Sequence, residues 1–493
     1  HALNRFFPYS TPARTPRSAT GALFFVLLVL LGFANGAHAR APMTCADVER
    51  LALEDHPVLA EKALEVDKAR EKLRDVDMGV ILPKFEVETG IGPAPGIRFN
   101  DRNAWLSLSG DTLYDTQRRF DFGEWGPFFG IKGSVVQPLN IARYRAGRRA
   151  ATLQVRVSEA QFQKERLDVS EEAQTICNQR LFALTMQREL ASSKNDLDKA
   201  QRKLVESLDA GDENVEQTDV LRLKSGRYAL DHGLHEADLG VRRSELALRF
   251  AVAARDSEDV PLADTVLSPR TDVIPPLDTL KMAALRFHPD LQRLRNGLAA
   301  RRELLKVAQG EIGPDIFLFG NIEYGKAWSS DRQSSGGDPF ARDPLNELTG
   351  VAGLGMRLRL NFWERYQSYR KERLDLRQLE RTEVYAARGI LMKVQDAWMR
   401  VEKARADMED AQLALRAADA WLKGAAMRYD LDRSEARNMT SPFRQAISSR
   451  NDYYSAVLEY NIAVASLFKS VGWTLSDYLG SLKAGNPPEE PKP

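Results

Sequence analysis

The chain contains short stretches in which apolar and polar residues alternate. In the clearest stretch, residues 351–362, Leu354 and Met356 alternate with Gly355 and Arg357. A period of two puts the two sets of side chains on opposite faces of a β-strand. Residues 84–91 and 129–135 show the same alternation, and in residues 316–324 it is clear only near the end. We therefore expect four strands, each with one apolar face and one small or charged face.

Longer stretches follow a helical pattern. No proline occurs between Pro138 and Pro261 or between Pro344 and Pro442, and proline disrupts helix interiors. Residues 141–208 alone would form about 100 Å of helix at about 1.5 Å per residue. In the second half of the chain, apolar residues form a seam whose members recur in coiled-coil steps of three and four. They are Leu391, Val394, Trp398, Val401, Ala404, Met408, Ala411, Leu415, Ala418 and Leu422. This seam does not by itself distinguish a helical tunnel from an antiparallel coiled coil with no enclosed space.

The two halves of the chain repeat one order of elements. His56 and the proline after it return 232 residues later as His288 and its proline, and Asn140 returns as Asn361 before a second long helix. Each half has the order helix, strand, strand, long helix, long helix. We expect a first repeat at residues 40–254, an inter-repeat linker at 255–275, a second repeat at 276–482 and a proline-rich disordered tail at 483–493.

Charge and composition exclude several classes of protein. Lys plus Arg number 70 and Asp plus Glu number 69, so the net charge of +1 gives no reason to expect a nucleic-acid partner. The sequence has no phosphate-binding glycine loop, no nucleophile elbow and no His-Glu-x-x-His motif. We expect no enzyme activity, no cofactor and no metal site.

Residues 1–39 have the features of a secretory signal peptide. Three arginines precede an apolar run at residues 22–33, and Ala-His-Ala at residues 37–39 has the small-x-small form of a cleavage site. We expect cleavage between Ala39 and Arg40. An uncleaved membrane anchor is the alternative, although the apolar core is short for a span of about 20 residues.

The four strands raise a question of closure. Beyond Arg40 no apolar run approaches the length of a transmembrane helix. An exported chain of this kind is either soluble or crosses a membrane as a β-barrel, in which every strand edge must be paired. Four strands cannot close a barrel because the smallest single-chain barrels have eight. Three copies would supply twelve strands, with long extracellular connections at residues 93–126 and 329–348.

The two cysteines have two interpretations. Cys45 and Cys177 could pair in an oxidising compartment. Cys177 follows Ala173 and precedes Leu181 at helical spacing, where a free cysteine behaves as a small core hydrophobe. We therefore favour unpaired cysteines.

Four segments, together with the order of the elements, carry a resemblance to a known family. They are LALEDHP at residues 51–57, VVQPL at 135–139, AALRFHP at 283–289 and YYSAVLEYNIA at 453–463. In these features the chain is similar to the TolC-like outer-membrane efflux proteins, or outer membrane factors. The resemblance implies an α+β, mostly α fold with a duplicated helix-strand-strand-helix repeat. In that fold a trimeric 12-stranded outer-membrane β-barrel continues into a long periplasmic α-helical coiled-coil barrel.

The resemblance also implies a function and partners. It implies the outer-membrane exit duct of a tripartite efflux or type I secretion system in a Gram-negative-type cell. The expected partners are two further copies in a homotrimer, outer-membrane lipid, a periplasmic adaptor (membrane fusion) protein and an inner-membrane transporter. A non-conducting periplasmic tether and a periplasmic hydrolase are the alternatives, and no catalytic constellation supports the hydrolase. The candidate residues of the barrel lumen are Lys132, Arg357, Arg359 and Asn361.

The two hairpin tips differ, which bears on the periplasmic gate. The family usually carries a glycine in each tip and then an Asp-Val-Leu-like step. The first tip keeps both with an acidic insert between them, whereas the second has Asp432 in place of the glycine and a neutral segment before Pro442. A solvated helix turn is the alternative interpretation of the acids. The gate candidates are Asp212, Glu213, Glu216, Asp219, Asn438 and Ser441, and the adaptor-docking candidates are Ala210, Gly211, Asp432, Arg433 and Ser434.

Four histidines have structural interpretations. His232 and His235 could share one helix face and hold a metal, but their charged surroundings favour an exposed face without a metal. His56 and His288 precede prolines at equivalent positions of the repeat. This placement indicates a role in helix entry rather than catalysis.

Overall fold

The structure is a computed structural model. It describes residues 42–100, 104–106, 112–114, 117–211, 215–254, 260–329, 343, 345–431 and 436–484. Several predicted features lie outside the described residues: the signal peptide with Ala39 and Arg40, the gate candidates Asp212 and Glu213, the docking candidates Asp432, Arg433 and Ser434, and tail residues 485–493.

The described part is mostly helical. The two longest helices have 69 and 70 residues, about 100 Å each at about 1.5 Å per residue. The expectation of very long helices is therefore confirmed. None of the helices in the described ranges is both long enough and apolar enough to cross a membrane. The helices are α2 (Cys45–Asp55), α3 (Pro57–Ile81), α4 (Ile141–Asp209), α5 (Gln217–Ala251), α6 (Leu277–Phe287), α7 (Pro289–Gly310), α8 (Phe362–Leu431), α9 (Ala436–Val471) and α10 (Leu475–Ala484).

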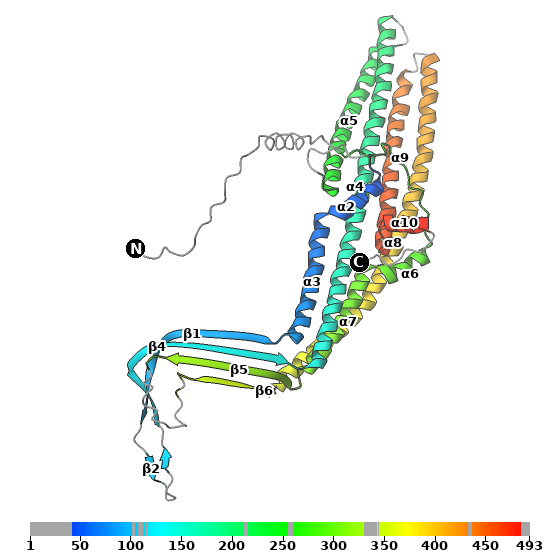
Figure 1. Cartoon of the computed structure of the whole chain (residues 1–493). Coiled ribbons are helices and arrows are strands. Elements are labelled where there is room, and N and C mark those ends of the chain that lie inside the picture. The colour runs from blue at the N-terminus through cyan, green and yellow to red at the C-terminus, as the bar shows by residue number, and fades with distance from the viewer. Residues whose placement is uncertain are drawn as a thin grey trace, which may run out of the picture.

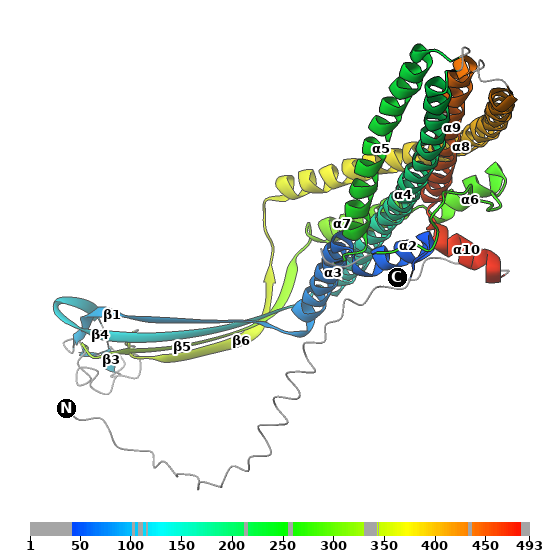
Figure 2. The same ribbon diagram turned by 90° about the horizontal axis from the view of Figure 1, so that it is seen from above.

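One antiparallel sheet projects from the helices. Its order is β1-β4-β5-β6, and β2 and β3 form a separate small hairpin. Figures 1 and 2 show the four strands side by side, extending away from one end of the helical bundle, while the α4–α5 and α8–α9 hairpins run to the other end. The strands are β1 (Lys84–Asn100), β2 (Ala104–Leu106), β3 (Thr112–Tyr114), β4 (Gln117–Pro138), β5 (Asp315–Ala327) and β6 (Leu348–Arg357).

Strand pairing continues through residues that we expected in a loop. β1 and β4 remain paired from Lys84 and Val136 out to Asn100 and Gln117, with one register shift after Pro95. The prediction of a loop over all of residues 93–126 is therefore wrong. Pro93 and Pro95 lie in β1, which is an edge strand of the sheet within one chain, where a missing N–H is tolerated.

The last strand is shorter than its alternation suggested. β6 ends at Arg357, so the lumen candidates Arg359 and Asn361 lie beyond it. Asn361 instead precedes α8, and its Nδ2 donates a hydrogen bond to Oε2 of Glu364 at 2.6 Å. Residues 358–361 keep the alternation without a strand partner, because alternation indicates extended backbone and not strand pairing. Pairing stops where β5 begins, at Asp315 opposite Arg357.

Each pair of short helices meets at a histidine. Nδ1 of His56, between α2 and α3, accepts a hydrogen bond from the N–H of Val58 at 3.3 Å. Nδ1 of His288, between α6 and α7, accepts one from the N–H of Asp290 at 3.2 Å. Proline follows each histidine at the first helical position, where its missing N–H costs nothing. The predicted role in helix entry is confirmed.

The long helices form a layer in the order α5, α4, α9, α8 (Figure 1). The largest apolar cluster lies where α6 packs against α8 and α9, and Val394 and Val401 of the predicted seam are buried in it. One face of α8 therefore packs against α9, as the seam predicted.

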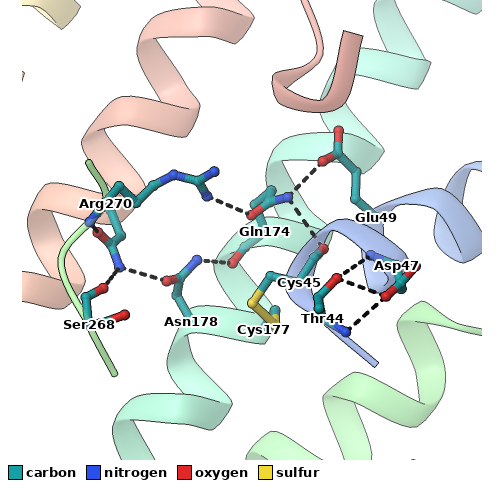
Figure 3. Close-up of a disulfide and its surroundings, with 10 residues drawn as sticks. Thr44, Cys45, Asp47, Glu49, Gln174, Cys177, Asn178, Ser268 and Arg270 are labelled. Carbon is teal, nitrogen blue, oxygen red and sulfur yellow. Dashed lines mark hydrogen bonds between the residues drawn. A yellow bond between two sulfur atoms is a disulfide. The ribbon is translucent and has the colours of Figure 1, made fainter. Parts of the chain in front are cut away.

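Cys45 and Cys177 form a disulfide, so the prediction of unpaired cysteines is wrong. The bond joins α2 to α4 with the two Cα atoms 5.6 Å apart (Figure 3). Cys177 is nevertheless fully buried among apolar neighbours, as its spacing indicated. Helical spacing shows that a residue faces the core, but it does not show which residue lies opposite.

Residues 260–276, within and just beyond the expected linker, cross the helices as an extended strap. The N–H of Leu267 donates to Oγ1 of Thr185 on α4 at 2.8 Å. The N–H of Arg270 donates to Oδ1 of Asn461 on α9 at 3.0 Å. The strap therefore ties together the two central helices of the layer.

Candidate functional site

One face of the sheet is apolar on all four strands. The register places Phe85, Val135, Gly320 and Ala352 in one row across the sheet. The other rows on this face are mainly apolar, and their polar members are Thr89, Gln137 and Lys326. These side chains are open to the surroundings, with Ile91 83% exposed. A continuous apolar surface of this kind is typical of contact with a membrane or a partner. The large exposed side chains of this lipid-type face are Phe85, Val87, Ile91, Ile131, Ile316, Leu318, Ile322, Tyr324, Leu348, Leu354 and Met356.

The opposite face carries most of the charged and small side chains of the sheet, together with a few large apolar ones. The apolar ones are Phe128, Val136, Phe317, Phe319 and Val351. Lys132, a lumen candidate, lies in register between Glu88 of β1 and Glu323 of β5. Arg357 lies on the same face, and its guanidinium is 5.2 Å from the ring centroid of Phe317. The structure thus brings two of the four lumen candidates onto one face of the sheet.

Tryptophans lie near both ends of the lipid-type face. Trp125 pairs in register with Pro95, and the main-chain N–H of Trp328 donates to the carbonyl of Pro127. Trp363 is the second residue of α8, beyond the other end of β6, and is 68% exposed. From Lys84 to Pro95, β1 spans roughly 36 Å at about 3.3 Å per residue, which is a height of about 25–30 Å for a strand tilted by about 35–45°. Aromatic residues at both edges of such a band are typical of transmembrane β-barrels.

Hydrogen bonds to two aspartates join α4 to α3 and to the sheet. Asp77, near the end of α3, accepts hydrogen bonds from Arg148 and from the Tyr144 hydroxyl of α4, at 2.7 and 2.9 Å. These two hydrogen bonds hold the pKa of Asp77 below its ordinary value. Asp315, at the start of β5, accepts from Arg143 at 2.9 Å. Neither aspartate has a periodic signal in the sequence, and sequence reasoning missed both.

The described residues of the first tip cap a helix. Gly211 follows α4 in the left-handed conformation with φ of 79°, which glycine adopts without strain. The N–H of Glu216 donates to Oδ2 of Asp219 at 3.3 Å, forming a capping box at the start of α5. Asp219 is buried and also lies 3.5 Å from the Arg222 guanidinium. Two gate candidates therefore stabilise the hairpin in the single chain.

The second tip enters its returning helix earlier than expected. α9 begins at Ala436, so Asn438 and Ser441 are helical and Pro442 lies inside the helix. A proline here removes one backbone hydrogen bond, to the carbonyl of Asn438, close to a helix end. The neutral segment before Pro442 is therefore the first part of α9. The Ser441 side chain is exposed.

Both outer helices of the layer carry exposed apolar stripes. On α8 the stripe repeats every seven residues, with Tyr385 80% and Met392 71% exposed. This stripe is separate from the seam that packs against α9, and our sequence analysis missed it. A heptad repeat of apolar residues is the pattern of a helix that packs against another helix. The stripe of α8 is Tyr385, Met392, Met399, Leu413 and Met427, and that of α5 is Leu221, Tyr228, Leu239, Leu246 and Phe250.

A buried carboxylate joins three helices beside the disulfide. Glu49 of α2 accepts hydrogen bonds from Ser170 and Gln174 of α4, at 2.5 and 2.7 Å, and from Ser476 of α10, at 2.6 Å. Figure 3 shows Gln174 between Glu49 and Arg270 of the strap. A buried carboxylate costs free energy unless its oxygens are hydrogen-bonded, and here they are.

The structure gives no support to a metal site at His232. Its Nε2 lies 3.6 Å from Oε1 of Glu236, and both side chains are exposed. Within the ranges that the structure describes, no three His, Cys, Asp or Glu side chains are grouped to hold a metal ion.

Comparison with known proteins gives matches by structure alone. No family model matches the sequence, and no curated protein does. The outer-membrane channel OprN matches with a TM-score of 0.67 and 15% identity, over 87% of this chain and 89% of that one. The CmeC outer membrane channel of Campylobacter jejuni matches with a TM-score of 0.65 and 17% identity, over 97% of both chains.

The open state of the MtrE outer membrane channel of Neisseria gonorrhoeae matches with a TM-score of 0.66 and 15% identity, over 87% of this chain and 89% of that one. Each of the three comparisons covers at least 87% of this chain. The chain therefore has the fold of the TolC-like outer-membrane channels.

Proposed function

We propose that this protein is the outer-membrane exit duct of a tripartite efflux or type I secretion system, and that it has no catalytic activity. The observation that carries the proposal is the sheet with one exposed, mainly apolar face and one face that holds most of its charged side chains, joined to helices about 100 Å long. An apolar outer face suits lipid and a polar inner face suits a water-filled passage. The helices then carry that passage into the periplasm.

The duct is a homotrimer in this proposal. β1 and β6 are the outer strands of the sheet, and in lipid each needs a neighbour because unpaired backbone groups are costly there. If β6 of one copy pairs with β1 of the next, three copies form one twelve-stranded barrel. Such a barrel is wide enough to leave a lumen, onto which Lys132 and Arg357 would face.

The helical layer supports the same arrangement. Its outer helices are α5 and α8, and each carries an apolar stripe directed away from the chain's own core. We place α8 of one copy against α5 of the next, so that the contact repeats around a three-fold axis. The duplication at residues 40–254 and 276–482, joined by residues 255–275, then gives each copy two hairpins in the tunnel wall.

The tips form the periplasmic entrance in this proposal. Residues 210–211 and 432–434 would contact the adaptor, and the inner-membrane transporter would lie beyond it. Asp219 and Glu216, with Asp212 and Glu213, would supply carboxylates around the entrance, and carboxylates favour cations in a pore. Asp219→Asn should reduce cation selectivity and Asn438→Asp should increase it. Unchanged reversal potentials for both variants under a salt gradient would remove the gate assignment.

Opposite faces of β6 provide the test of the barrel. Leu354→Arg puts a cation on the lipid-type face at a cost of about 2–4 kcal/mol near mid-bilayer, whereas Val351→Arg puts it on the polar face. We expect outer-membrane trimer from wild type and Val351→Arg, and little from Leu354→Arg, by membrane fractionation and native mass spectrometry. Equal insertion of the two variants would contradict the assignment of faces. A wild-type protein extracted only as a monomer would contradict the trimer.

A further inference from the structure

A cavity of about 410 Å³ lies between the two helical hairpins near their tips. Helices α4, α5, α8 and α9 all contribute to its wall. Small residues leave the space open: a Cβ added to Gly226 of α5 would meet nothing within 4 Å. The apolar part of the wall is Leu197, Ala200, Leu204, Leu223, Leu422, Ala426, Tyr429, Met439 and Phe443.

The space is partly open to solvent between the hairpins, and its wall is more apolar than polar. The volume falls in the range of pockets that hold drug-sized molecules, which are apolar with a few polar groups. The Thr440 hydroxyl lines the cavity and is buried without a hydrogen-bond partner among the described residues.

The charged groups of the wall are mostly cationic. Lys199, Lys203, Arg222 and Arg450 line the cavity, and Asp196 is the single acid that does so. Lys199 is ion-paired with Asp196 of the same wall at 3.3 Å. The carboxylates paired with Arg222 and Arg450 belong to Asp219, Asp419 and Glu189, which are outside the wall. A molecule in the cavity would therefore meet apolar side chains and cationic hydrogen-bond donors.

We propose that this cavity binds an amphiphilic organic carboxylate of drug size. The apolar body fills the space between the leucines and Phe443, and the carboxylate accepts hydrogen bonds from Arg222 and its cationic neighbours. The occupant contacts both hairpins, so its binding joins them near the tips. Binding itself does not depend on the export function, but an effect on conductance rests on the proposed duct.

The test uses a matched pair of probes on the full-length protein in phosphatidylcholine nanodiscs. We expect 2-naphthylacetate to bind at one site per chain, by calorimetry against empty nanodiscs, at least tenfold more tightly than the neutral 2-naphthylacetamide. Gly226→Leu should weaken this binding at least tenfold because its side chain enters the cavity. Gly147→Leu is the control, since it makes the same change on α4, also in open space, away from the cavity wall.

Each other outcome would overturn the proposal. Equal binding of acid and amide would mean a neutral apolar occupant, and no binding of either would leave the space to a protein partner or a second copy. Binding that Gly226→Leu does not change would place the ligand elsewhere. In planar bilayers the acid should shorten the open time of wild type and not of Gly226→Leu. If neither wild type nor Gly226→Leu conducts ions, while the acid binds to wild type and binds more weakly to Gly226→Leu, the duct proposal fails and the binding site stands.

Discussion

The two halves of the chain hold a short helix on a long one by different means. In the first half, α2 is bonded to α4 through the Cys45–Cys177 disulfide, inside a small apolar cluster. In the second half, α6 lies on α8 and α9 in a larger cluster that includes Phe468, Trp473 and Tyr478. The offset from His56 to His288 places Leu277 where the first half has Cys45, and Leu277 packs against this cluster.

The position equivalent to Cys177 is also apolar in the second half. The offset from Asn140 to Asn361 places Trp398 where the first half has Cys177, and Trp398 packs against the same cluster as Leu277. One half therefore uses a covalent bond and the buried Glu49 hydrogen bonds, and the other uses apolar contact. The comparison shows that equivalent contacts between a short helix and a long one can be stabilised by two kinds of interaction. A reductant should weaken the first, and truncation of a core side chain should weaken the second.

The largest expected effect is in the apolar half. Phe468→Ala removes a fully buried ring and should lower the free energy of unfolding by about 3–5 kcal/mol. Urea unfolding followed by tryptophan fluorescence measures the loss. Phe85→Ala is the control, because Phe85 is 74% exposed on the sheet and should matter far less in detergent. Similar losses for the two variants would contradict the assignment of the core.

The next effect is in the disulfide half. Replacing Cys45 and Cys177 with alanine should cost about 2–4 kcal/mol, since the bond closes a long loop across 132 residues of sequence. Dithiothreitol should lower the unfolding midpoint of wild type and of Leu277→Ala, and leave that of the double alanine variant unchanged. A wild-type midpoint that dithiothreitol does not move would show that the disulfide adds no stability.

The ends of the two returning helices give an opposed pair of changes. Gly472, after α9, has φ of 99°, and an added Cβ would lie 2.9 Å from Cα of His288. Gly472→Ala should therefore cost about 1–3 kcal/mol. Ala253, after α5, has φ of 48° and pays the strain of a left-handed residue, so Ala253→Gly should stabilise by about 0.5–1 kcal/mol. Denaturation midpoints that move in the same direction would contradict the comparison.

The smallest expected effect depends on pH. Burial lowers the pKa of His288, with Lys393 and Lys164 acting in the same direction and Asp290 against it. Neutral His288 accepts the cap hydrogen bond, so this stability is fully present above about pH 6.5 and is lost as pH falls through the lowered folded pKa. The loss should be about 1 kcal/mol.

A capping residue that does not titrate tests this effect. His288→Asn keeps a good N-cap and should remove this part of the pH dependence between about pH 8 and pH 5. Thermal unfolding midpoints of wild type and variant across that range provide the measurement. Parallel curves would mean that another group is responsible for the acid dependence.

The regular patterns of the sequence predicted much of the fold. Alternation in residues 351–357 identified β6 and its two faces, and three-four spacing around Val394 identified the face of α8 that packs against α9. The histidine-proline pairs marked two helix starts. These features are local, so a few neighbouring residues are enough to specify them.

Long-range pairing was not predictable in the same way. The Cys45–Cys177 bond, the strap and the continued pairing of β1 with β4 each depend on residues that meet only after folding. Among the candidate site residues, Lys132 and Arg357 share the polar face of the sheet, but Arg359 fell beyond the strand. The exposed apolar stripe of α8 is also a regular pattern in the sequence. It was missed because the same helix carries another apolar pattern, the seam that packs against α9.

Conductance tests the central claim most directly. Purified full-length protein, reconstituted into planar bilayers as the trimer, should produce discrete ion-conducting steps that favour cations over anions under a salt gradient. Trimers that insert into the bilayer, as protease protection of the strands would show, and yet pass no ions would contradict the exit duct and leave a non-conducting tether across the periplasm.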